Sequence, residues 1–196
     1  MRKRVLLLAG IAMVLFVGSG AALAATVIRC PEGSGNYSHR CLGTPNSDVM
    51  YGTERRDFLE TLGGADVIHA FGGSDTLMGG FGPDTMYGGS GEDSMHGGGR
   101  GGVDPATNVL RGGSGEDTLG GDKGNDIIFG GAGSDFHLFG YRGNDEIHGG
   151  TGDDFLDAEG QGQDRIYCGA GRDYYTADKN DFVAKDCEKK TYVHVA

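Results

Sequence analysis

A nine-residue repeat runs from near Gly43 almost to the end of this 196-residue chain. Its clearest copies are residues 79–87 (GGFGPDTMY), 88–96 (GGSGEDSMH) and 112–120 (GGSGEDTLG), which share the pattern G-G-x-G-x-D-x-U-x, with U a large apolar residue. Neither an ordinary globular core nor an enzyme site requires an Asp at every ninth residue behind a glycine-rich turn. The repeat therefore constrains the fold and the function more than any other feature of the chain.

Extending this register in both directions gives fourteen repeats between residues 43 and 176. The repeat at Gly97 is six residues too long, the repeat at Gly130 has one extra residue near His137, and Ala158 is read as a second single insertion. Asp104-Pro105 in the long repeat predicts a surface loop. The sixth position holds Asp48, Asp57, Asp66, Asp75, Asp84, Asp93, Asn108, Asp117, Asp126, Asp135, Asp145, Asp154, Asp164 and Asp173. The eighth position holds Met50, Leu59, Ile68, Leu77, Met86, Met95, Leu110, Leu119, Ile128, His137, Ile147, Leu156, Ile166 and Tyr175.

Each repeat combines a turn with a short strand. The glycines of its first half permit the positive backbone angles of a tight turn, and the x-U-x half alternates outward, inward, outward with the period of a strand. One repeat cannot bury its apolar residue alone, so stacked neighbours must supply the core. Two repeats per coil give an all-β fold, a parallel β-roll (β-solenoid) of about seven coils.

The repeats resemble the RTX, or haemolysin-type, calcium-binding repeat family, which folds as such a β-roll. The resemblance implies Ca²⁺ between the turns of repeats n and n+2, held by turn carbonyls and by two sixth-position carboxylates. Oxygen ligands at six or more positions suit Ca²⁺ better than Mg²⁺, and roughly six to nine ions are expected. The implied pairs are Asp66 with Asp84, Asp75 with Asp93, Asp93 with Asp117, Asp117 with Asp135, Asp126 with Asp145, Asp135 with Asp154, Asp145 with Asp164, and Asp154 with Asp173.

Three repeats depart from the family pattern. The turns GTPNSD (residues 43–48) and GTERRD (residues 52–57) lack the second and fourth glycines, and Arg55 and Arg56 bring positive charge. We therefore expect no calcium there and an apolar N-terminal stack instead. Asn108 offers an oxygen without a charge, which predicts a weaker site.

The composition agrees with calcium binding. The net charge is −11, and loss of the three cations Arg2, Lys3 and Arg4 would make it −14, so a compact roll without counterions would repel itself. This acidity argues against nucleic-acid partners, which select a basic stripe. An acidic, glycine-rich chain can also be disordered. The strict register favours folding of the calcium-loaded form, and disorder is the expectation without calcium.

Residues 1–24 have the pattern of a signal peptide, with a basic start, an apolar run and Ala22-Leu23-Ala24 as the cleavage signal. Cleavage is expected before Ala25, which makes the protein secreted, extracellular or attached to the cell surface. The alternative is an uncleaved membrane anchor. No later segment approaches the length of a membrane span. Familiar RTX proteins carry a C-terminal export signal instead, so this start indicates another secretion route.

Four cysteines suit an exported protein, in which an even count favours disulfides. Three connectivities are possible. We expect Cys30–Cys41 and Cys168–Cys187, because a seven-coil stack separates the two pairs. Each bridge would pin a cap, residues 25–42 before the β-roll of residues 43–176 and residues 177–196 after it, and the caps would protect the terminal sheet edges. A zinc site is the alternative, although the spacing is not C-x-x-C.

No catalytic constellation is evident, so the chain is not expected to be an enzyme. None of the histidines lies in H-E-x-x-H, and no G-x-S-x-G motif occurs. Paired acids such as Asp153-Asp154 could mimic a glycosidase dyad, but chance proximity explains them in so acidic a chain. The six histidines are His39, His69, His96, His137, His148 and His194.

Sorting the strands by parity predicts a row of rings along one outer face. Its ninth positions hold Tyr51, His69, Tyr87, Arg111, Phe129, His148 and Tyr167. Strand propensity with stacking along the row explains this pattern. The sharper interpretation is a face for a protein partner or for self-association. The predicted function is a secreted calcium-binding β-roll with a structural or interaction role. The alternatives are an adhesin or an accessory or inhibitory subunit that acts through an outer face, and, as the least favoured, a small hydrolase.

Overall fold

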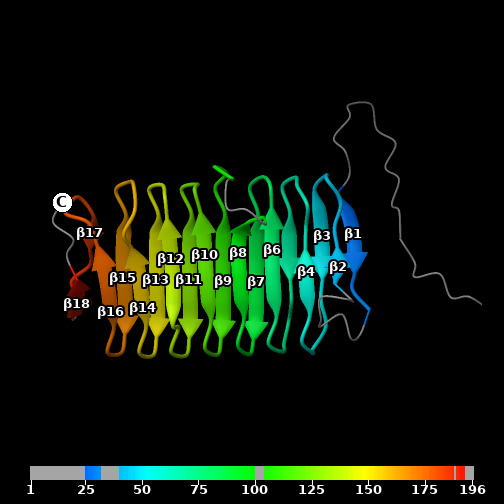
Figure 1. The fold of residues 1–196 in the computed structure, drawn as a ribbon. Coiled ribbons are helices and arrows are strands. Elements are labelled where there is room, and N and C mark those ends of the chain that lie inside the picture. The colour runs from blue at the N-terminus through cyan, green and yellow to red at the C-terminus, as the bar shows by residue number, and fades with distance from the viewer. Residues whose placement is uncertain (1–24, 32–39, 100–103, 188, 193–196) are drawn as a thin grey trace, which may run out of the picture.

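The computed structural model describes residues 25–31, 40–99, 104–187 and 189–192, which form two parallel nine-stranded sheets and no helix. Figure 1 shows the strands side by side from β1 at one end to β17 and β18 at the other. The first sheet consists, in spatial order, of β1 (Thr26–Arg29), β3 (Asp48–Tyr51), β5 (Val67–His69), β7 (Thr85–Ser90), β9 (Val109–Ser114), β11 (Ile127–Ala132), β13 (Glu146–Thr151), β15 (Arg165–Ala170) and β17 (Phe182–Val183). The second consists of β2 (Cys41–Leu42), β4 (Phe58–Glu60), β6 (Thr76–Gly80), β8 (Ser94–Gly98), β10 (Thr118–Asp122), β12 (His137–Tyr141), β14 (Phe155–Ala158), β16 (Tyr174–Ala177) and β18 (Lys189–Tyr192).

Consecutive strands alternate between the sheets, so two repeats make one coil and the predicted β-roll is confirmed. Residues at equal repeat positions pair across coils, as Met50 does with Ile68 and Ile128 with Ile147. Their side chains fill the space between the sheets with no exposed surface. The core is therefore a column of the apolar residues that a single repeat cannot bury.

Two details of the predicted register are wrong. Leu138, not His137, occupies the core of β12; it pairs with Leu119 and is fully buried, whereas His137 points outward. Phe136 is the extra residue and is 58% exposed, because the backbone bulges just after Asp135. Ala158 is buried, and the exposed Glu159 is the insertion. In both places the apolar side chain takes the interior position.

Glycine is required where the turns of successive coils touch. Gly115 has φ +130, and a Cβ built on it would lie 1.9 Å from the carbonyl oxygen of Gly91 in the coil before. Gly133 stands in the same relation to Gly115, at 1.8 Å. A side chain at either position would separate the coils and break the stack.

Both ends of the roll are closed by disulfides, Cys30–Cys41 and Cys168–Cys187, as predicted. The first joins the residue directly after β1 to the start of β2, and β1 continues the first sheet beyond the repeats. At the other end β17 and β18 add one strand to each sheet. The expected signal peptide lies outside the described residues. Within the described part, no helix is long and apolar enough to cross a membrane.

The row of rings on the first sheet is present as stacked pairs. His69 lies between Tyr51 and Tyr87, with ring centroids 5.4 and 4.8 Å away. His148 lies in the same way between Phe129 and Tyr167, at 4.7 and 4.6 Å. The two histidines thus pack as members of the row rather than as metal ligands.

Candidate metal centre

The sixth-position carboxylates form two buried columns, one along each line of turns. In each pair two repeats apart, the backbone N–H of the earlier residue donates to Oδ1 of the later carboxylate. Asp117 donates in this way to Asp135 at 2.9 Å, and Asp135 to Asp154 at 2.9 Å. All eight pairs that the resemblance implies are joined by this bond, at 2.7 to 3.0 Å. The strands on either side set this spacing, because they pair in register.

The second carboxylate oxygen of most of these residues has no hydrogen-bond partner. It is buried, and burial of an unpaired charged oxygen is costly. One such atom would be an exception, but the same atom lacks a hydrogen-bond partner in nine turns, which fits a cation that these oxygens share. The nine atoms are Oδ2 of Asp66, Asp75, Asp84, Asp93, Asp117, Asp126, Asp135, Asp145 and Asp154.

Burial raises the pKa of these carboxyl groups. It brings the pKa of Asp84 to about 8 and that of Asp145 to about 7, even though the backbone hydrogen bond on Oδ1 lowers both. Charge repulsion within the columns adds to the rise, as from Asp154 and Asp117 onto Asp135, whose pKa reaches about 7. Near neutral pH the fold must therefore either take up protons or surround these groups with positive charge.

A backbone carbonyl oxygen lies close to several of the orphaned carboxylates. A Cβ built on Gly130 would come within 2.2 Å of Asp135 Oδ2 and 2.7 Å of the Gly149 carbonyl oxygen. At Gly112 the corresponding distances are 2.3 Å to Asp117 Oδ2 and 2.7 Å to the Gly130 carbonyl oxygen. Glycine at the first position thus keeps open a place toward which a carboxylate oxygen and a carbonyl oxygen from two repeats later both point.

This donor set fits Ca²⁺. Within the described part of the chain, no three His, Cys, Asp or Glu side chains gather into a metal cluster. A cation in these turns would therefore be held by paired carboxylates and backbone carbonyls, which are hard oxygen ligands in a flexible arrangement. Zinc, which prefers four nitrogen or sulfur ligands, fits poorly.

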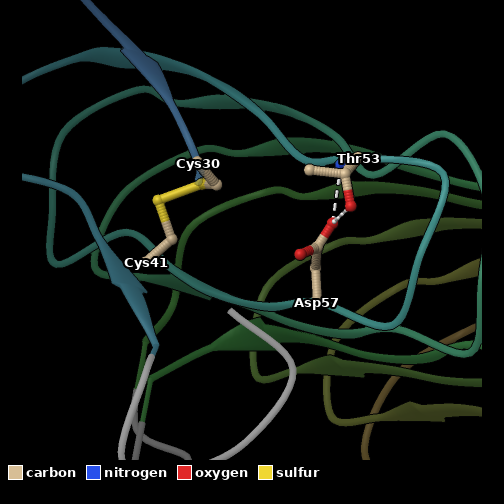
Figure 2. The surroundings of a disulfide bond; sticks show 4 residues. All are labelled: Cys30, Cys41, Thr53 and Asp57. Carbon is tan, nitrogen blue, oxygen red and sulfur yellow. Dashed lines mark hydrogen bonds between the residues drawn. A yellow bond between two sulfur atoms is a disulfide. The ribbon is translucent and has the colours of Figure 1, made fainter. Parts of the chain in front are cut away.

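The first two repeats satisfy their carboxylates without a cation. Figure 2 shows Thr53 directed at Asp57 near the Cys30–Cys41 bridge. The Thr53 amide and hydroxyl both donate to Asp57 Oδ2, at 2.6 and 2.9 Å. Thr44 similarly donates its amide to Asp48 Oδ2 at 2.6 Å. The expectation of no calcium here rested on the missing second and fourth glycines and on Arg55 and Arg56, and the structure adds that threonine supplies hydrogen bonds to the carboxylates.

One residue of the carboxylate columns, Asp181, was not predicted from the sequence. Asp181 Oδ1 accepts the N–H of Asp164 at 3.0 Å, and its Oδ2 accepts the N–H of Asp178 at 2.6 Å. The turn before it is one residue short of the repeat, which hid it. The order Asp181, Phe182, Val183 matches positions six to eight of a repeat, which hold an Asp, an outward residue and an inward apolar residue. This order could have identified Asp181 from the sequence, and Val183 does pack on the core.

Asn108 has the geometry of the column without the charge. Its Oδ1 accepts the N–H of Asp84 at 3.0 Å, and its own N–H donates to Asp126 at 2.7 Å. Its amide nitrogen donates to the carbonyl oxygen of Gly121 at 3.4 Å. A neutral amide thus fits the fold and occupies a carbonyl that a cation would otherwise use, which supports the expectation of a weaker site.

A family model described as the RTX calcium-binding nonapeptide repeat matches in four copies, over residues 42–77, 69–99, 104–136 and 137–161. The chain belongs to this RTX family. The match and the fold together make it a calcium-binding β-roll protein of a structural repeat type. A search of curated proteins found no match.

Proposed function

We propose that this RTX protein is an exported β-roll that folds when its turn columns bind Ca²⁺. The ligands would be Asp66, Asp75, Asp84, Asp93, Asp117, Asp126, Asp135, Asp145, Asp154, Asp164 and Asp173, together with carbonyl oxygens of the turns. The observation that carries the proposal is the set of nine buried carboxylate oxygens without a hydrogen-bond donor. Roughly six to nine ions, each between repeats n and n+2, would neutralise them.

The end coils would be the part that can form first. Asp48 and Asp181 each have both carboxylate oxygens bonded by protein donors, and a disulfide closes each end. The intervening coils hold the orphaned oxygens, so their formation at neutral pH needs the cation. Binding energy would then appear as folding energy, and order would spread along the stack from its ends.

Export follows from the signal-like residues 1–24 and is supported by two disulfides, which persist in oxidising compartments. Outside the cell, a rigid calcium-loaded roll would have a structural or interaction role. The stacked row on the first sheet supports the second of these, because it presents rings such as Tyr87, 36% exposed, along one flat face. A binding partner or a second copy would contact that face.

The test is a calcium titration of the mature protein after EDTA treatment, followed by far-UV circular dichroism. We expect little β signal in EDTA at pH 7.5 and a cooperative rise with CaCl₂. MgCl₂ at equal ionic strength serves as the control and should not replace calcium. A full β spectrum in excess EDTA at this pH would overturn the proposal.

A further inference from the structure

A hollow of about 780 Å³ lies on the outside of the second sheet, where β8, β10 and β12 end. It exists because Gly120 stands in a ninth position where the neighbouring strands carry His96 and Phe139. A Cβ on Gly120 would lie 2.9 Å from Tyr141 Cε2 and 3.2 Å from His96 Nδ1. The Tyr141 ring therefore reaches back over β10 and borders the hollow. Its size is that of a small-molecule site.

Two strained residues line the hollow side by side. Asp122 has φ +111 and Tyr141 has φ +68, and they are paired in the register of β10 and β12. Both occupy the second repeat position, where Gly113 and Gly131 adopt the same positive φ without strain. Side chains in this backbone region cost free energy, and such strain is concentrated at functional sites. The chain thus places a carboxylate and a phenol at this one spot.

The orientation of both side chains is fixed. The Tyr141 ring stacks on Phe139 at 5.3 Å and remains 45% exposed. Asp122 Oδ2 accepts the backbone N–H of Asp104 at 3.2 Å. A flat aromatic surface and an anchored hydrogen-bond acceptor are therefore presented together.

The rim carries charges of both signs. Lys123 and Arg142 follow Asp122 and Tyr141 in their turns, and Glu159 completes the rim one coil further on. Among the described residues, none of these three forms an ion pair with another described residue within 4 Å. Hydrogen-bond donors and acceptors of both charges thus surround the hollow.

We propose that this hollow binds a neutral saccharide. A sugar ring packs its C–H face on an aromatic surface, and its hydroxyls both donate and accept, which matches a carboxylate, a guanidinium and an ammonium in one place. With two acidic and two basic side chains, the lining favours a ligand that carries no net charge. The polar rim disfavours a purely apolar ligand. This site is separate from the calcium columns and adds a binding function to the roll.

The test is a glycan array carrying neutral and acidic glycans, probed with the calcium-loaded protein. We expect binding to neutral glycans, reduced at least tenfold in Tyr141→Ala and in Asp122→Asn. Phe182→Ala is the matched control, because it removes a ring of the first sheet that is 52% exposed and lies outside the hollow, and it should bind as the wild type does.

Three results would overturn the inference: no glycan bound, only acidic glycans bound, or binding unchanged in both hollow variants. Circular dichroism in calcium checks that each variant is folded. If Tyr141→Ala misfolds, Asp122→Asn decides, because an amide retains the acceptor for Asp104. A failure of calcium-driven folding would show in the spectrum and not on the array, so the two proposals can fail separately.

Discussion

Replacement of Asp135 by Asn should have opposite effects on the roll with and without calcium. In the calcium-free fold, burial raises the pKa of Asp135 from 3.8 to about 7. At about 1.36 kcal/mol per pKa unit, the ionised group costs the folded state on the order of 4 kcal/mol above pH 7. An amide removes this cost, keeps an oxygen for the N–H of Asp117, and places a nitrogen toward the Gly149 carbonyl oxygen, as Asn108 does toward that of Gly121.

In calcium the same change removes a charge that two ions would share. A loss of only about 1.4 kcal/mol would raise the calcium midpoint tenfold. The assay is circular dichroism in two series, a pH titration in EDTA and a calcium titration at pH 7.5. Asp135→Asn should refold in EDTA at a higher pH than the wild type and should need at least several times more calcium.

The matched control is Asp48→Asn, whose carboxylate oxygens are already bonded by Thr44. It should leave the calcium midpoint nearly unchanged. If Asp135→Asn stabilised the roll both with and without calcium, destabilised it in both conditions, or behaved like Asp48→Asn, the assignment of the orphaned oxygens to calcium would be refuted.

Three further predictions follow from the same geometry. In EDTA the wild type should be more structured near pH 5 than near pH 8. The buried carboxyl groups have higher pKa values in the folded state than in the unfolded state, so they favour folding at low pH, and this stability is lost as the pH rises through about 6 to 8. Equal circular dichroism spectra at both pH values would contradict this. Gly130→Ala should weaken calcium-dependent folding far more than Gly63→Ala, since a Cβ meets Asp135 Oδ2 at 2.2 Å in the first and a carbonyl oxygen at 3.4 Å in the second, and equal calcium midpoints would count against the role of the first glycine. Reduction of the Cys168–Cys187 bridge should remove hydrogen-exchange protection first at residues 168–187, and simultaneous loss along the whole roll would argue against a local cap.

The repeat made most of the architecture predictable, because strict spacing fixes which residues turn inward and which turns stack. The pairing of Asp117 with Asp135 was implied by the resemblance to the RTX family, and the two disulfides were expected from the separation of the ends. The prediction was wrong at His137, since one extra residue can bulge on either side of Asp135 and only packing decides that Leu138 is the buried one.

The hydrogen bonds that threonine donates in the first two turns could not be predicted from the sequence either. The sequence GTERRD does not indicate that the amide and the hydroxyl of Thr53 both donate to Asp57 Oδ2, because this depends on the backbone path of the turn. The hollow beside Tyr141 likewise arises from a missing side chain at Gly120 and from a ring that folds back from the next coil. The periodicity predicts the environment of residues at repeating positions, whereas the effect of a departure from the repeat is seen only in the three-dimensional structure.

The most direct test of calcium as the occupant of the turns is an anomalous difference map from crystals grown in CaCl₂. We expect peaks between the paired carboxylates of the middle coils, such as Asp117 with Asp135 and Asp135 with Asp154, each within contact of Oδ2. No peak is expected beside Thr44 or Thr53. Absence of peaks in the middle coils, or peaks of equal height at the first two turns, would contradict the account.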